Sequence, residues 1–135
     1  ASIGNIGKII AEGKIMLSNA YAPYSEFPVG AVVLSNNGEI FSGCNIENTS
    51  YSLTVCAEVA AISKMVSAGH QNIEAIFVFS NSSQFVTPCG ACRQKISEFA
   101  KNDVYVYLVN QQGKIRQHPL TALMPHAFNL QESDL

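Results

Sequence analysis

The distribution of apolar residues along the chain predicts a succession of helices and strands. Between about residues 2 and 20 they recur near the helical period, which predicts an amphipathic helix that is capped by Ser2 and covers one face of a sheet. The apolar stripe of this helix consists of Ile3, Ile6, Ile10 and Leu17, widened by Ile9 and Met16. The next stretch, residues 21–28, contains two prolines and is predicted to be a loop.

Shorter apolar runs predict the strands. The run at residues 29–34 is followed by the turn sequence Asn36-Asn37-Gly38, and residues 39–44 then form the returning strand of a hairpin. Further strands are predicted at residues 75–80, at residues 104–109 and around Ile115.

Two longer helices are predicted between these strands. One starts at residue 54 or 55, ends before Gly69, and has an inner stripe that includes Val59, Ile62 and Val66. The other covers residues 89–100, with Cys92, Ile96 and Phe99 on one face, and one or two helical turns follow at residues 119–124. Because strands alternate with helices after the hairpin, we expect an α/β fold: a three-layer α/β/α sandwich around a mixed five-stranded sheet, in a single domain of residues 1–135.

The composition narrows the classes of partner. Charged residues make up 13% of the chain, against about 25% in an average soluble domain, and the net charge is −2 with no basic run. Since a polynucleotide backbone requires clustered cations, no nucleic-acid partner is expected. The sequence shows neither an apolar run of about 20 residues nor a signal-peptide pattern, so we expect no membrane partner and a cytoplasmic location. The low charge also suits burial of surface in an oligomer, and a compact apolar core explains it as well.

Three of the four cysteines lie at the starts of predicted helices. Cys89 and Cys92 are three residues apart and point the same way in a first helical turn, and Cys56 leads the preceding helix. Thiolates suit Zn²⁺, helix N-termini favour the thiolate form, and three protein ligands leave the open position of a catalytic zinc site. Two alternatives stay open: buried cysteines that act as small apolar residues, or a four-ligand structural site completed by Cys44 or His70.

Glu58, two residues after Cys56, would lie beside the open position of such a site. A carboxylate that does not bind the metal can act there as a general base. On spacing alone, an ordinary glutamate favoured by the dipole of the first helical turn explains Glu58 equally well. We interpret His70, His118 and His126 as surface or packing residues.

Several motifs together resemble one known family. The segments Cys56-Ala57-Glu58 and Pro88-Cys89-Gly90-Ala91-Cys92-Arg93-Gln94 resemble the signature of the zinc-dependent cytidine deaminases. Further segments resemble the short, homotetrameric members that act on free nucleosides; they are Tyr21-Ala22-Pro23-Tyr24-Ser25, Phe27-Pro28-Val29-Gly30-Ala31, Gly43-Cys44-Asn45-Ile46-Glu47-Asn48, and Leu123-Met124-Pro125 with Phe128. The resemblance covers the chain from about Tyr21 to Phe128.

The resemblance implies an enzyme of pyrimidine salvage that converts cytidine and 2′-deoxycytidine to uridine and 2′-deoxyuridine with release of ammonia. It implies one Zn²⁺ per subunit, held by Cys56, Cys89 and Cys92, which activates a water for attack on C4. Glu58 would move protons from that water to ring atom N3 and then to the leaving amine.

The resemblance also implies a set of substrate-binding residues and a homotetramer. Asn45 and Glu47 are two residues apart, face one way on an extended chain, and would hold the ribose 3′-hydroxyl. Phe27 would pack against the base or the sugar, Ala57 would also contact the substrate, and Tyr51 and Phe128 would reach a neighbouring subunit's site. Without the resemblance, Asn45 and Glu47 could be a polar strand end, Phe27 a core residue and Tyr51 an ordinary loop tyrosine.

One departure from the family pattern concerns the charge of the metal site. Tetrameric cytidine deaminases often have an arginine after the catalytic glutamate, which hydrogen-bonds to thiolate sulfurs, whereas this chain has Val59. Deaminases of the antibiotic blasticidin S also lack that arginine, but they do not have the Asn-x-Glu pair in the same form. The presence of Asn45 and Glu47 therefore favours cytidine as the substrate. The rival functions are deamination of a modified cytosine nucleoside, a non-catalytic zinc-binding domain and, third, a polynucleotide-editing deaminase.

Overall fold

A mixed five-stranded sheet forms the centre of the computed structural model, which describes residues 6–88 and 90–123. The strand order is β2-β1-β3-β4-β5, where β3 and β4 run parallel and the other neighbours run antiparallel. The strands are β1 (Val29–Ser35), β2 (Ile40–Cys44), β3 (Ile73–Ser80), β4 (Ala100–Val109) and β5 (Ile115–Pro119). The predicted mixed sheet is therefore confirmed.

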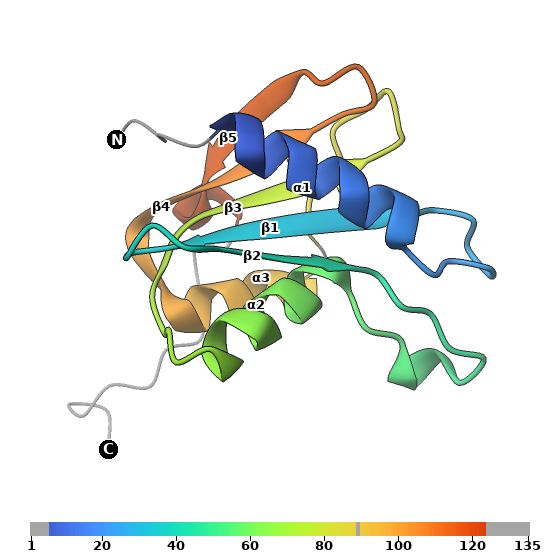
Figure 1. The fold of residues 1–135 in the computed structure, drawn as a ribbon, viewed down its shortest axis with the longest axis horizontal. Helices are drawn as coiled ribbons and strands as arrows, with labels where there is room; N and C mark the ends of the chain where they lie inside the picture. Colours follow the sequence, from blue (N-terminus) through green and yellow to red (C-terminus); the bar gives the residue numbers. More distant parts are fainter. Residues whose placement is uncertain (1–5, 89, 124–135) are drawn as a thin grey trace.

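Helices cover both faces of the sheet. Figure 1 shows α1 (Ile6–Asn19) on one side, and α2 (Ala57–Ser67) with α3 (Gly90–Phe99) on the other. Two short helical segments complete the described chain, η1 (Tyr51–Leu53) and α4 (Leu120–Leu123). The three-layer α/β/α sandwich is confirmed.

The side chains of the sheet divide between two apolar cores because successive residues of a strand point to opposite faces. On β3, Phe77 and Phe79 pack on the α1 side, whereas Ile76 and Val78 belong to the core beneath α2 and α3. The second core is the larger one and contains the buried residues of α2, α3 and α4. This core, on the α2 and α3 side of the sheet, therefore supports the two helices whose first turns carry Glu58 and Cys92.

The buried stripes of α1 and α2 differ from those predicted. In α2 the buried apolar residues are Ala57, Ala61, Ile62 and Met65, whereas Val59 is only half-buried and Val66 is 38% exposed. The prediction followed the bulky residues, but the helix lies so close to the sheet that alanines form much of its inner face. In α1 the buried residues are Ile9 and Gly13, while Ile6 is 41% exposed; Ser2 and Ile3 lie outside the described residues.

Several boundaries also differ. The second helix begins at Ala57, not at residue 54 or 55, because Val55 pairs with Ile46 in an isolated bridge. The last residue of α3 leads directly into β4, so this strand begins at Ala100 and not near residue 104. Gly69 follows α2 with a left-handed φ of 95°, and it ends the helix as predicted.

Gly43 allows α2 to approach β2 closely. A Cβ atom at this position would lie 2.5 Å from the backbone nitrogen of Ala61, 2.6 Å from Cβ of Ala60 and 2.8 Å from the carbonyl oxygen of Ala57. Because two of these three atoms belong to the helix backbone, no side-chain movement could relieve the overlap. The absence of a side chain at residue 43 therefore sets the height at which the first turn of α2 sits above the sheet.

We expect Gly43→Ala to lower the free energy of unfolding by about 1–3 kcal/mol or more, the usual effect of overpacking. Gly7→Ala is the matched control: Gly7 lies in α1, nothing described lies within 4 Å of the added Cβ, and alanine should stabilise the helix by about 0.5–1 kcal/mol. Denaturant unfolding of both variants measures the difference. An unchanged stability in Gly43→Ala would show that α2 can shift away from β2 without loss.

Candidate active site

The start of α2 is held by a short extended segment of the chain. Ile46 and Val55 exchange backbone hydrogen bonds of 2.8 Å in both directions, and Ile46 also forms a parallel bridge with Tyr21. Cys56 follows at once as the N-cap of α2, with an extended ψ of 152°. The segment that carries Asn45 and Glu47 is thereby linked directly to the one that carries Cys56 and Glu58.

Glu58 is a carboxylate inside the apolar core. It lies in the first turn of α2 and only 5% of its surface is exposed. Burial raises the pKa of Glu58 above its ordinary value, and a backbone hydrogen bond together with one from the Cys92 side chain opposes that rise. The contact with Cys92 brings the first turns of α2 and α3 together.

The structure describes two of the three predicted zinc ligands. Cys56 is half-buried at the start of α2 and Cys92 is 1% exposed in the first turn of α3, whereas Cys89 lies outside the described residues. Within residues 6–88 and 90–123, no group of three or more His, Cys, Asp or Glu side chains could hold a metal ion. Cys89 is not among those residues, so the full ligand set stays a prediction.

His70 is too far from Cys56 to complete a zinc site with it. It follows the far end of α2, whose 11 residues span about 16 Å, and its Nε2 atom lies 3.3 Å from Oε2 of Glu39. The alternative of a structural site with His70 as the fourth ligand is therefore wrong.

Arg93 connects the loop before Cys89 to the end of α4. Its Nε donates to the carbonyl oxygen of Pro88 at 2.8 Å, Nη1 donates to that of Leu123 at 2.9 Å, and Nη2 donates to Oγ1 of Thr87 at 3.1 Å. Arg93 therefore has a structural hydrogen-bonding role near the predicted zinc loop. It also places a cation beside Pro88, one residue before a predicted thiolate ligand.

Asn45 and Glu47 face the same loop, as the predicted extended conformation requires. Asn45 accepts a hydrogen bond from the backbone N–H of Val29 and donates one to the carbonyl oxygen of Phe27, both at 3.0 Å. Oε1 of Glu47 accepts from the backbone N–H groups of Tyr24 and Ser25 at 3.0 Å, and the Ser25 hydroxyl donates to Oε2. These bonds, that of the Ser25 hydroxyl above all, lower the pKa of Glu47.

Two predicted aromatic contacts lie on the surface of the single chain. Phe27 is 39% exposed, so it is not a core residue, and Tyr51 in η1 is 89% exposed. Phe128 lies outside the described residues. Further large apolar side chains are exposed on the two segments that carry Phe27 and Tyr51, residues 21–27 and 46–53. We call the whole group the apolar patch; it consists of Tyr21, Tyr24, Phe27, Ile46, Tyr51 and Leu53. Both segments project from the same end of the molecule (Figure 1).

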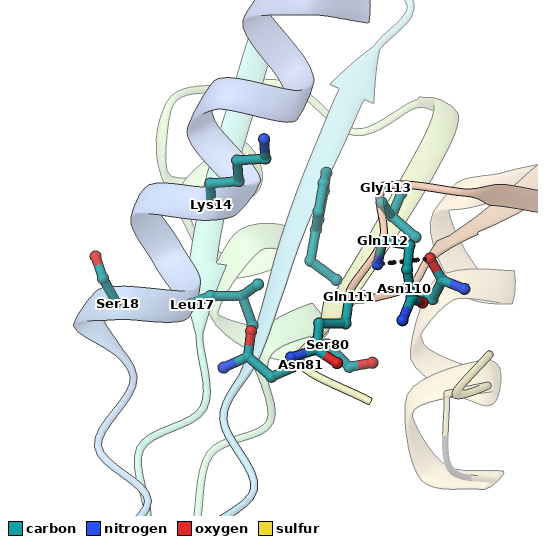
Figure 2. A pocket seen from close by; sticks show the side chains of 11 residues that line it. Lys14, Leu17, Ser18, Ser80, Asn81, Asn110, Gln111, Gln112 and Gly113 are labelled. Atoms are coloured by element: carbon teal, nitrogen blue, oxygen red, sulfur yellow. Dashed lines mark hydrogen bonds between the residues drawn. The ribbon is translucent and has the colours of Figure 1, made fainter. Parts of the chain in front are cut away.

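A separate hollow of about 410 Å³ lies on the α1 side of the sheet. Lys14, Leu17 and Ser18 of α1 line one wall, and residues at the ends of β3 and β4 line the other (Figure 2). Glu58 and Ala57 lie on the opposite side of the sheet. This hollow is therefore distinct from the predicted zinc site.

Ser25 belongs to one of the motifs that resemble the family, but its sequence context predicted no role for it. Its hydroxyl donates to the Glu47 carboxylate and accepts from the backbone N–H of Phe27 at 3.1 Å. The only signal in the sequence was a small hydroxyl residue in a proline-containing loop. Because the partner lies 22 residues away, its contact with Glu47 is not local.

Comparison with known proteins identifies the family. The model of the cytidine and deoxycytidylate deaminase zinc-binding region matches residues 8–108. The chain belongs to this family. The match includes Glu58 and all three predicted zinc ligands, and the family description confirms that the matched region is a zinc-binding one.

Individual relatives agree with this assignment. Cytidine deaminase from Sporosarcina psychrophila is 45% identical over 128 residues, which cover 95% of this chain and 94% of the relative. The crystal structure of cytidine deaminase from Burkholderia pseudomallei superposes with a TM-score of 0.84 at 41% identity, covering 90% of this chain and 98% of that one. Blasticidin-S deaminase from Bacillus cereus is 35% identical over 105 residues, which cover 72% of this chain and 74% of the relative.

Within the described residues, none of the helices is long and apolar enough to cross a membrane.

Proposed function

We propose that this member of the family is a zinc-dependent deaminase of cytidine and 2′-deoxycytidine that serves pyrimidine salvage. The observation that carries the proposal is the buried Glu58 carboxyl in hydrogen-bond contact with Cys92, where the first turns of α2 and α3 meet. A buried carboxyl group with a raised pKa is suited to accept and return a proton near neutral pH.

The chemistry of the surrounding groups fits a thiolate-bound zinc. Cys56 begins α2 and Cys92 lies in the first turn of α3, so both are near helix N-termini, which favour anionic sulfur. With Cys89 they would hold one Zn²⁺ per chain. Three thiolates leave a formal charge of −1. With Val59 in place of arginine, the two helix N-termini and the guanidinium of Arg93, which lies beside Pro88, would offset that charge.

The proposed reaction is hydrolytic, from cytidine and water to uridine and ammonia. When bound, zinc would supply an activated water for addition to C4. Glu58 accepts a proton from the water at its carboxylate and transfers it to N3 of the ring. It then takes the proton of the hydroxyl group added at C4 and delivers it to the amino group, which leaves as ammonia. Asn45 and Glu47 hold the sugar, Phe27 contacts the base or sugar, and Ala57, between Cys56 and Glu58, lines the pocket.

The metal proposal predicts that Cys92→Ala loses most of its zinc, because a tetrahedral thiolate site cannot keep its affinity with one sulfur removed. Cys89→Ala should behave in the same way. Cys44→Ala is the matched control and should retain one zinc per chain, since Cys44 ends β2 and is not in the proposed set. Elemental analysis of the purified variants measures this. Full zinc in Cys92→Ala, or loss in Cys44→Ala, would contradict the ligand set.

The base proposal predicts that Glu58→Gln keeps zinc and fold but lowers kcat on cytidine by roughly 10²–10⁴-fold, the typical contribution of a general acid–base group. Ammonia release from cytidine measures turnover, and blasticidin S as a second substrate tests the rival specificity. Near-normal turnover in the variant would remove Glu58 from the reaction. A zinc-replete wild type that releases ammonia from blasticidin S and not from cytidine would favour the rival.

The apolar patch supports a homotetramer in which Tyr51 and Phe128 reach the sites of neighbouring subunits. We expect light scattering to give four times the chain mass of 14.5 kDa. Tyr51→Ala should shift the population to smaller species, because the side chain is 89% exposed in the single chain and loses little within it. Ile15→Ala, at an apolar residue 48% exposed on α1 and outside the patch, is the control. A fully active monomer would exclude the assembly.

A further inference from the structure

Glu47 and Asn45 form most of their possible hydrogen bonds with the loop of residues 24–29. A carboxylate offers about four acceptor positions, and three bonds from Tyr24 and Ser25 already use three of them. Asn45 uses one of its two amide N–H donors on the carbonyl oxygen of Phe27 and accepts from Val29. By this inventory the pair retains one acceptor position on Glu47 Oε2, one donor on Asn45 Nδ2 and a second acceptor position on Asn45 Oδ1.

The free acceptor position of Glu47 and the free donor of Asn45 together match a single hydroxyl group. A hydroxyl donates one hydrogen bond and accepts another, so it can donate to Glu47 and accept from Asn45 without leaving a surplus polar atom. The match exists because the Ser25 hydroxyl occupies the other position of Oε2. Without that hydroxyl, Oε2 would have two unfilled positions, and the carboxylate would be held only through Oε1.

We propose that Ser25 is a positioning residue, which sets the orientation of the Glu47 carboxylate for one hydroxyl of the substrate's sugar. The proposal rests on the proposed nucleoside deaminase function. Ser25 acts through Glu47 and need not touch the substrate. Its hydroxyl also accepts from the backbone N–H of Phe27, so the same group links the sugar-binding carboxylate to the residue proposed to contact the base or sugar.

The backbone between these contacts supports this arrangement. Glu26 has a φ of 56°, in the left-handed region that residues other than glycine seldom adopt. The bonds from Ser25 and to Phe27 lie on either side of it and hold the loop in that conformation. The lowered pKa of Glu47 is consistent with this, because the same donors favour the charged carboxylate.

The test compares zinc-loaded wild type with Ser25→Ala on cytidine and on 3′-deoxycytidine, which lacks the hydroxyl in question. We expect kcat/KM for cytidine to fall about tenfold, the size expected for one hydrogen bond to a charged group, with the loss mainly in KM. For 3′-deoxycytidine, kcat/KM should fall less than about threefold, because this substrate has no 3′-hydroxyl to bind to the Glu47 carboxylate that Ser25 orients. Ser25→Thr keeps a hydroxyl and should restore the preference for cytidine.

Thr49→Val is the matched control for a loosened loop. It removes the 2.6 Å contact between the hydroxyls of Tyr24 and Thr49, which ties the same loop without involving Glu47. The ratio of kcat/KM for the two substrates should stay at the wild-type value. Equal losses on both substrates in Ser25→Ala would overturn the proposal and leave Ser25 as a loop-folding residue only.

Titration of the Glu47 carboxyl by NMR gives a readout that does not depend on turnover. The pKa should rise toward the ordinary value in Ser25→Ala and stay low in Thr49→Val. A depressed pKa in the folded state contributes stability above the pKa of the unfolded chain, and this contribution is lost as the pH falls through the folded value. The stability difference between wild type and Ser25→Ala should therefore shrink in acid.

The outcomes separate this proposal from the function on which it rests. A zinc-loaded wild type inactive on cytidine would remove the proposed function and this inference with it. An active wild type whose Ser25→Ala variant shows an unchanged substrate ratio or an unchanged Glu47 pKa would overturn this inference alone.

Discussion

The seating of α2 on β2 is the contact on which the candidate site depends. Gly43 has no side chain, and the alanines of the first turn add little bulk, so the helix backbone comes within van der Waals distance of the strand. This close approach carries Glu58 into the core beside Cys92. A bulkier pair of surfaces would lift the helix start and separate the carboxyl from the thiol. The reactive groups are thus held by packing of small residues that carry no chemistry themselves.

A buried carboxyl group is unfavourable for the fold unless it is neutral or well partnered. Here burial raises the pKa of Glu58, and the Cys92 side chain supplies a hydrogen bond that partly opposes the rise. Buried groups with perturbed pKa values are concentrated at catalytic sites, because the same environment that disfavours the charge tunes proton transfer. The proposed role of Glu58 as general base would give this arrangement a chemical purpose that a purely structural core glutamate would lack.

The proposed sugar-binding pair, Asn45 and Glu47, is positioned by hydrogen bonds and not by close packing. The extended segment at residues 45–47 is held between Tyr21 and Val55 by backbone hydrogen bonds. The side chains of Asn45 and Glu47 form hydrogen bonds with the loop of residues 24–29. The large apolar residues of these two segments are left exposed in the single chain. One end of the molecule therefore combines the proposed sugar-binding pair with the exposed apolar surface on which the proposed homotetramer rests.

The sequence by itself determined the layer order, the mixed sheet and the order of helices and strands, because these follow from local periodicity and turn residues. It also predicted that Asn45 and Glu47 face one way. It did not determine the inner stripe of α2, since Val59 and Val66 are more hydrophobic than the alanines that are actually buried. Nor did it reveal the role of Ser25, whose partner is 22 residues away in the chain. These features depend on how closely distant segments approach, and only the tertiary packing sets that distance.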